Sequence, residues 1–97
     1  MRDPDLFLLG EYHGEVVAAV LGGFDGRRGM MYHLAVAKEH RGMGFAWRMV
    51  AELEDRLRNK GCIKYYLLVT KDNDAAMRFY EVNGWDRMDL YVYGKEL

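Results

Sequence analysis

The stretch from Tyr32 to Leu57 constrains this chain most, because it joins a strand, a glycine turn and a helix in one run. An apolar segment, Tyr32 to Val36, leads through a polar corner into the turn Arg41-Gly-Met-Gly-Phe-Ala46. The two glycines of the turn carry no Cβ, so its backbone N–H groups can approach an anion closely. The helix that begins near Phe45 adds unpaired N–H groups and the positive end of its dipole. This layout predicts a site for a phosphorylated ligand.

The turn differs from the two most familiar phosphate loops. No Lys-Ser or Lys-Thr pair follows the second glycine, as a Walker loop requires, and the dinucleotide fingerprint has three glycines at a wider spacing. Arg41 supplies a fixed cation beside the glycines. Taken alone, Gly42 and Gly44 could equally serve to make a tight connection between strand and helix. A second motif is needed to choose between these interpretations.

Such a motif lies downstream, in the segment Asn73-Asp-Ala-Ala76-Met-Arg-Phe-Tyr80-Glu-Val-Asn-Gly84-Trp85. It resembles the pattern Asn-x-x-Ala-x-x-x-Tyr-x-x-x-Gly-aromatic of the GNAT superfamily of N-acetyltransferases. The turn at Arg41 resembles motif A of the same superfamily. That motif begins with Arg or Gln, has Gly three residues later, and ends with Gly or Ala two residues after that Gly. The two motifs occur in the family's order, and the resemblance extends from about Leu6 to Leu97.

Composition restricts the class of protein. We expect one domain, residues 1–97, because 97 residues suffice for a single core. The charged residues make up 30% of the chain and sum to −1, so no strong field would attract nucleic acid. The one cysteine, Cys62, forms no internal disulfide and fits a reducing cytosol. No run approaches the roughly 18 apolar residues of a membrane span, and the first residues lack signal-peptide order. We expect a cytoplasmic protein.

Three apolar runs of strand length open the chain. His13-Gly14 separates the first two as a hairpin turn, and Asp25 to Gly29 makes a second turn. Gly22-Gly23 indicates a bulge or a close approach by another group. Antiparallel strands are therefore expected over Leu6 to Tyr12, Glu15 to Phe24 and Met30 to Val36.

The next segment has the spacing of a surface helix that stops at Gly61. Its apolar positions are Met49, Val50, Leu53 and Leu57, and its supporting ion pairs are Glu52 with Arg56 and Glu54 with Arg58. The β-rich run Ile63 to Thr70 predicts a parallel strand after this helix. A short helix capped by Asp72, Asn73 or Asp74 follows and ends at Gly84, and two closing strands are expected at Trp85 to Met88 and Leu90 to Tyr93.

The predicted fold class is α+β, with a mixed, mostly antiparallel sheet in the order β-β-β-α-β-α-β-β. A parallel βαβ crossover lies at the cofactor site. This order is similar to the GNAT core from its second strand onward. GNAT domains normally begin with one more strand and one or two helices that form a wall of the acceptor pocket. We expect this chain to begin after them.

The resemblance implies acetyl-CoA as the cofactor and no metal site. It implies that the strand backbone from Leu34 to Val36 hydrogen-bonds the pantetheine arm, and that an N–H near Leu34 polarises the thioester carbonyl. Leu34 and Val36 can also be core residues, because these contacts use only their backbones. The cofactor-binding residues implied in this way are Leu34, Ala35, Val36, Arg41, Gly42, Met43, Gly44, Phe45, Ala46 and Asn73.

Asn73 and Tyr80 are seven residues apart on one helix, so they share a face, with Met77 expected between them. By resemblance, Asn73 binds the pantetheine and Tyr80 is the catalytic general acid that protonates the leaving thiolate. A phenol with an ordinary pKa near 10 is protonated at neutral pH and can act as this donor. Tyr80 could instead be an ordinary half-buried aromatic residue, and Asn73 only a helix cap.

The sequence does not identify a general base. In the branch that acetylates ribosomal protein N-termini, a glutamate precedes the valine corresponding to Val69, where this chain has Leu68. His33 could act through water, although a lone strand histidine is more often structural. Tyr32, Tyr91 and Tyr93 are no better candidates, and many relatives release the proton through ordered water.

We interpret the sequence as an acetyl-CoA-dependent N-acetyltransferase in which a small-molecule or peptide amine attacks the thioester directly in a ternary complex. One alternative is a CoA-binding sensor or assembly module without its own acceptor site. Another is a phosphate-binding structural domain, which would make the second motif accidental. We also expect a homodimer, because the run Leu6 to Leu9 would lie at an uncovered sheet edge and Leu90 to Tyr93 would offer an apolar surface.

Overall fold

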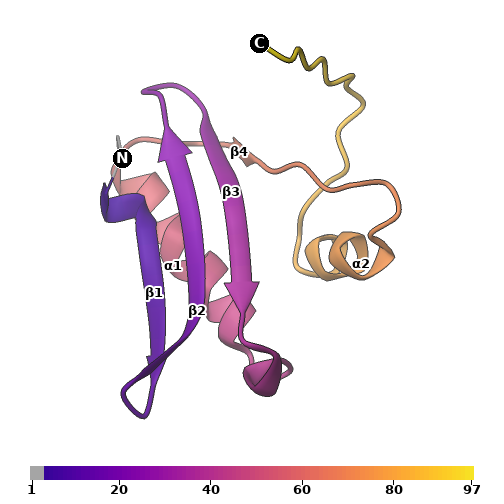
Figure 1. The fold of residues 1–97 in the computed structure, drawn as a ribbon. Coiled ribbons are helices and arrows are strands. Elements are labelled where there is room, and N and C mark those ends of the chain that lie inside the picture. The colour runs from indigo at the N-terminus through magenta and orange to yellow at the C-terminus, as the bar shows by residue number, and fades with distance from the viewer. Residues whose placement is uncertain (1–3) are drawn as a thin grey trace.

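Three long strands form an antiparallel meander in the computed structural model, which describes residues 4–97. A short 3-10 turn, Pro4–Leu6, leads into β1 (Phe7–Tyr12), β2 (Glu15–Phe24) and β3 (Gly29–Val36) (Figure 1). The hairpin turn at His13-Gly14 is confirmed, and both of its residues have a positive φ. The second turn is held by the Asp25 carboxylate, which accepts hydrogen bonds from the backbone N–H groups of Arg27 and Arg28.

The glycine pair in β2 explains a break in the strand register. The pairing of β2 with β3 shifts between Leu21 and Gly22, which confirms the predicted bulge. A Cβ at Gly22 would stand 2.7 Å from Leu53 Cδ1, and one at Gly23 would stand 2.7 Å from Tyr32 Cε2. The two glycines therefore also allow close approaches on both faces of the sheet.

Helix α1 (Phe45–Asn59) lies across one face of this sheet and encloses the core (Figure 1). All four predicted apolar positions are buried, with Leu53 and Leu57 at most 2% exposed. Burying a leucine side chain contributes roughly 1.5 to 3 kcal/mol. The polar face carries the predicted Glu52–Arg56 and Glu54–Arg58 ion pairs at 3.5 and 3.4 Å. Residues buried between the helix and the strands are Leu6, Leu8, Ala18, Val20, Met31, Met49, Val50, Leu53, Leu57 and Cys62.

The parallel crossover is confirmed, but its second strand is short. β4 (Tyr65–Tyr66) runs parallel to β3 and pairs Tyr65 with Gly29 and Tyr66 with Met30. The predicted strand from Ile63 to Thr70 is thus reduced to two residues, because the chain leaves β3 after Tyr66. It continues to α2 (Asp74–Val82), which lies beside β3 and β4 rather than on the open face of the sheet (Figure 1).

The two closing strands expected at Trp85 to Met88 and Leu90 to Tyr93 are not formed. Residues 85–97 have no strand pairing, and the described sheet has the order β1-β2-β3-β4. A β-rich composition forms a strand only where a neighbouring edge supplies hydrogen bonds. Here the tail, residues 85–97, leaves α2 apart from the strands (Figure 1), and Tyr91 and Tyr93 are 92% and 93% exposed.

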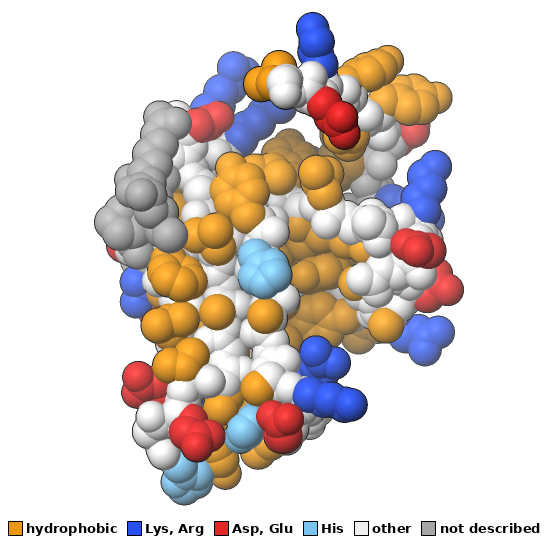
Figure 2. All heavy atoms as spheres, in the orientation of Figure 1, with side chains coloured by type: hydrophobic (Ala, Val, Ile, Leu, Met, Phe, Trp, Pro, Cys, Tyr) orange, Lys and Arg blue, Asp and Glu red, His pale blue; other side chains and the backbone are white. Residues whose placement is uncertain are grey.

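The face of the sheet opposite α1 is apolar and is not covered by any helix of residues 4–97. Cross-strand pairing aligns Phe7 with Leu21 and His33, and Leu9 with Ala19 and Ala35. Figure 2 shows this face as hydrophobic side chains spread over three strands, with one histidine among them. Within the same residues, no helix combines the length and apolar character needed to cross a membrane.

Candidate functional site

A cleft opens where β3 and the chain after β4 separate. Because parallel pairing stops at Met30 and Tyr66, the two segments diverge, and α2 forms the third wall. Figure 2 shows the resulting hollow, lined by hydrophobic side chains, between the sheet and α2. Its volume is about 330 Å³, and it is lined by Met31, Tyr32, His33, Leu34, Leu67, Leu68, Val69, Thr70, Asn73, Ala76 and Tyr80. A larger, shallower hollow of about 490 Å³ on the outer side of α2 contains none of the predicted site residues.

The glycine turn has the geometry of an anion cradle. Gly42 and Gly44 have φ values of 81° and 84°, in the left-handed region that favours glycine. A Cβ at either position would project into open space. Within residues 4–97, the backbone N–H groups of Gly42, Met43 and Gly44 have no hydrogen-bond acceptor. The N-cap residue Gly44 also provides no side-chain cap, so the first-turn N–H groups of α1 stay available. These donors fit a pyrophosphate group.

Arg41 ties the turn to the end of β3. Its Nε donates a hydrogen bond to the carbonyl oxygen of Val36 at 3.2 Å, and the side chain is exposed. This bond leaves the two terminal guanidinium nitrogens free of protein acceptors within the described residues. Basic side chains, Lys or Arg, stand at the lower end of the hollow in Figure 2, where Figure 1 places the loop before α1.

The predicted cofactor residues fall into two groups, one that lines the cleft and one that lies toward the glycine turn. Leu34 lines the cleft together with Asn73 and Tyr80. Ala35 and Val36 continue β3 away from the cleft and toward the turn. Met43 is exposed, whereas Phe45 packs its ring 5.6 Å from Tyr12. Phe45 and Ala46 thus anchor the start of α1 with half-buried side chains and leave their backbone N–H groups to the cradle.

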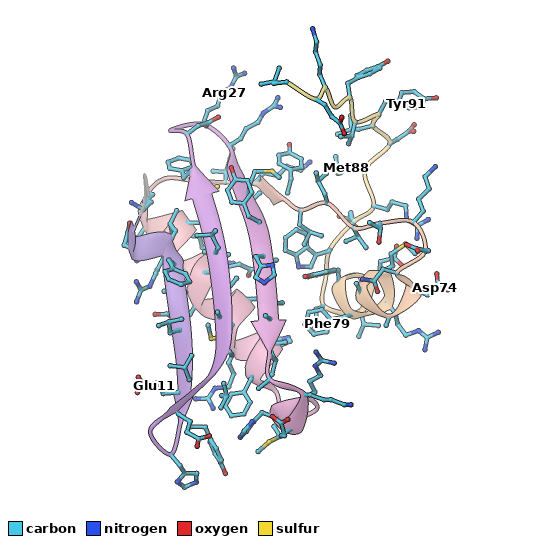
Figure 3. All side chains as sticks on the ribbon, viewed as in Figure 1. Glu11, Arg27, Asp74, Phe79, Met88 and Tyr91 are labelled. Carbon is cyan, nitrogen blue, oxygen red and sulfur yellow. The ribbon has the colours of Figure 1, made fainter. Side chains whose placement is uncertain are left out.

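Asn73 and Tyr80 both face the cleft from α2. The Asn73 Oδ1 accepts a hydrogen bond from the Ala76 backbone N–H at 3.1 Å, so the predicted capping role is confirmed. This bond uses the oxygen and leaves the amide nitrogen free to donate. The residue between them on the cleft wall is Ala76, whereas Met77, which we expected there, lines the outer side of the helix. Figure 3 shows Asp74 and Phe79 on opposite sides of α2.

Tyr80 is half-buried and its hydroxyl has no protein partner within residues 4–97. Burial raises the pKa of the Tyr80 phenol above its ordinary value, because desolvation disfavours the phenolate. The group is therefore protonated throughout the physiological range. Its position in the cleft wall suits it to donate a proton to an atom bound there.

Two of the residues considered as bases lie at the cleft and two do not. His33 and Tyr32 line it from β3 and are both exposed. Leu68, which stands where the related branch has a glutamate, also lines it. Tyr91 lies on the tail, well away from the sheet (Figure 3), and Tyr93 is 93% exposed.

Several lining residues were not predicted from the sequence. Leu67 and Thr70 belong to the run expected to be a paired strand, and they line the cleft because that run leaves the sheet. Ala76 was part of the second motif, and its small side chain keeps the wall between Asn73 and Tyr80 low. The sequence feature that could have identified Ala76 as a lining residue is its place in the second motif, four residues before Tyr80.

Comparison with known proteins gives a consistent assignment. The family described as the acetyltransferase (GNAT) family matches residues 1–85. An acetyltransferase of Pectobacterium atrosepticum is 44% identical over 96 residues, which cover 99% of this chain and 68% of the relative.

Solved structures share the same fold. Ard1 from Thermoplasma volcanium superposes with a TM-score of 0.79 at 27% identity, over 84% of this chain and 55% of Ard1. A GNAT family acetyltransferase from Elizabethkingia anophelis with acetyl-CoA bound gives a TM-score of 0.78 at 17% identity, over 84% and 54% of the two chains. This chain therefore spans only about half the length of each of these two solved proteins.

Proposed function

The chain belongs to the acetyltransferase (GNAT) family, and from that premise we propose that it is an N-acetyltransferase that moves the acetyl group of acetyl-CoA to a primary amine. One observation carries this proposal: the cleft beside β3 has Tyr80 and Asn73 in its wall, while the glycine turn lies at the far end of the same strand. With a proton donor in the cleft and an anion cradle at the other end of β3, the site suits a long cofactor that has a reactive end and a phosphorylated end. The acceptor would be a small molecule or a peptide.

The residues proposed to hold the cofactor act mainly through their backbones. The N–H groups of Gly42 to Ala46, with Arg41, would bind the pyrophosphate. Each charge-assisted hydrogen bond of this kind contributes about 1.5 to 3 kcal/mol. The edge of β3 from Leu34 to Val36 and the Asn73 amide nitrogen would bind the pantetheine arm. Because Arg41 already occupies the Val36 carbonyl, we expect the arm to bond chiefly near Leu34.

When bound, the cofactor supplies an activated acetyl thioester. In our proposal, the acceptor amine attacks its carbonyl carbon directly, a C–N bond forms and the C–S bond breaks. A backbone N–H near Leu34 polarises the carbonyl oxygen, and the Tyr80 hydroxyl donates its proton to the departing sulfur. The amine loses its proton to water, and His33 is a basic side chain among the residues that line the cleft.

A second candidate function is a CoA-binding sensor or assembly module without its own acceptor site. The uncovered sheet face favours it, because no helix of residues 4–97 forms an acceptor wall there. Measuring thiol release from acetyl-CoA with a panel of amines and peptides separates the two functions. Turnover with any amine supports the enzyme, whereas saturable CoA binding without turnover supports the module.

Acetyl-CoA is expected to stabilise the folded chain against heat. A ligand at a hundredfold excess over its Kd adds roughly 2.7 kcal/mol to the free energy of unfolding. In a domain of this size, that change raises the Tm by several degrees or more. A thermal-shift titration measures it, with free acetate as the control. No shift in Tm, together with no heat in a calorimetric titration, would refute cofactor binding.

We also propose a homodimer. β1 is an edge strand that exposes Phe7 and Leu9, at 43% and 53%, and the tail residues 90–93 are exposed as well. Long apolar edges are normally covered, and a second copy could cover this one by edge pairing or by exchange of the tail. Sedimentation at micromolar concentration should give about twice the 11.3 kDa of one chain, and activity should fall on dilution. An 11.3 kDa species with full activity would contradict both expectations.

A further inference from the structure

We infer that Trp85 is a positioning residue, which fixes the Tyr80 ring in the cleft wall by packing between Tyr80 and Tyr65. The inference rests on the proposed acid role of Tyr80 and adds a residue to the same site. Trp85 does not line the cleft, so it would act through Tyr80 and not on the substrate.

The end of α2 determines the first contact. The Trp85 backbone N–H donates to the Tyr80 carbonyl at 3.0 Å, and the Gly84 N–H donates to the Glu81 carbonyl at 3.4 Å. Gly84 has a φ of 91°. These features define a Schellman motif, in which the side chains of the two residues joined by the outer hydrogen bond come into contact. Accordingly, the Trp85 and Tyr80 ring centroids lie 5.4 Å apart in an edge-on arrangement.

The second contact joins Trp85 to the body of the protein. Its ring lies 4.5 Å from the ring of Tyr65 on β4. The Tyr65 hydroxyl donates a hydrogen bond to the Glu54 carboxylate on α1, and the Tyr65 backbone pairs with Gly29 of β3. A continuous set of contacts therefore runs from α1 through Tyr65 and Trp85 to Tyr80.

Few other contacts can orient the helix that carries Tyr80. No residue of α2 is buried, and Tyr80 and Trp85 are the rings from this part of the chain that pack against the core. Among the described residues, the other ring contact of Tyr80 is with its sequence neighbour Phe79, which moves with the helix. Without Trp85, α2 could shift relative to β3, and a displacement of about 1 Å can cost up to roughly 10²-fold in rate.

The titratable groups around Tyr80 come from three elements. They are Tyr65 of β4, His33 and Tyr32 of β3 across the cleft, and Glu54 and Arg58 of α1 beyond Tyr65. Trp85 contributes no charge, but its ring packs against the ring of Tyr80, and Tyr80 is half-buried. Its removal should hydrate Tyr80 and move the alkaline limb of the kcat profile toward lower pH.

The test uses Trp85→Leu, which keeps apolar volume for folding but removes the flat ring. We expect kcat to fall about 10-fold, with the acetyl-CoA Kd within about twofold of wild type and the alkaline limb shifted to lower pH. Trp85→Phe should restore most of kcat. In a Tyr80→Phe background, Trp85→Leu should have little further effect, because the group it positions is gone. Val82→Ala, at a residue of the same helix that is 77% exposed, is the matched control.

Three results would contradict the role of Trp85 or the acid role of Tyr80 on which it rests. An unchanged kcat and pH profile in Trp85→Leu would overturn the inference while leaving the proposed function intact. An equal loss in both backgrounds would also overturn it, because Trp85 would then act independently of Tyr80. An undiminished kcat in Tyr80→Phe would instead refute the acid role itself, and the inference would fail for that separate reason.

Discussion

Gly44→Val is expected to abolish acetyl-CoA binding, with at least about 100-fold loss of affinity, whereas Arg41→Ala should weaken it about 10-fold. A valine side chain at position 44 would project into the open space of the turn and strain its φ of 84°. It would thereby block several backbone N–H groups at once. Removing Arg41 deletes one charged contact, and its bond to Val36 is only one of those that hold the turn. Isothermal titration with acetyl-CoA compares the two Kd values.

A matched glycine separates cradle occlusion from backbone strain. Gly26 has a φ of 95° and open space around its Cβ position, but it lies in the turn between β2 and β3, away from the cradle. Gly26→Val should therefore cost similar stability and leave the Kd nearly unchanged. If Arg41→Ala proved the more damaging of the two site variants, the turn would be mainly a charge site.

The elements from β1 to α1 were predictable because each carries its own local signal. His13-Gly14 and Asp25 mark turns by their backbone preferences, and the apolar spacing from Met49 to Leu57 fits only a helix. Each strand of the meander pairs with its neighbour in sequence, and α1 covers the three strands that come directly before it. Local chemistry therefore sufficed to predict the meander and the helix that covers it.

The later strands were less predictable because their pairing depends on distant partners. Ile63 to Thr70 is as β-rich as any strand, yet only Tyr65 and Tyr66 pair, since β3 and β4 separate there to form the cleft. Leu90 to Tyr93 likewise pair with no strand of the described sheet. A β-rich composition indicates that a segment can fit into a sheet, but it does not indicate whether a strand with an unpaired edge lies next to that segment in the fold.

The candidate site was predicted in outline from two motifs and missed in its detail. The shared face of Asn73 and Tyr80 follows from their seven-residue spacing. Ala76 and Met77 lie at about equal angles to either side of that face, so spacing could not decide which would line the cleft. The contact between Trp85 and Tyr65 depends on where the chain turns after α2, which no periodicity describes.

Tyr80→Phe is expected to lower kcat about 10²-fold or somewhat more, while the acetyl-CoA Kd stays nearly unchanged. The substitution removes only the hydroxyl, which has no protein partner among residues 4–97, so the ring contact with Trp85 and the fold should persist. The loss is confined to the step in which the thiolate departs. Tyr66→Phe, which removes the hydroxyl of a half-buried tyrosine outside the cleft lining, is the matched control and should leave kcat unchanged.

The pH dependence gives an independent check on the role of Tyr80. Burial raises the pKa of this phenol above the ordinary value near 10, so the protonated, active form predominates below that raised pKa. In the wild type, kcat should therefore decline only at strongly alkaline pH, as the phenol loses the proton that it would donate. Tyr80→Phe should lack this limb, because solvent then protonates the thiolate at every pH. A variant that keeps both the wild-type kcat and the alkaline limb would show that Tyr80 is only a packing residue, and that the proton comes from elsewhere in the cleft.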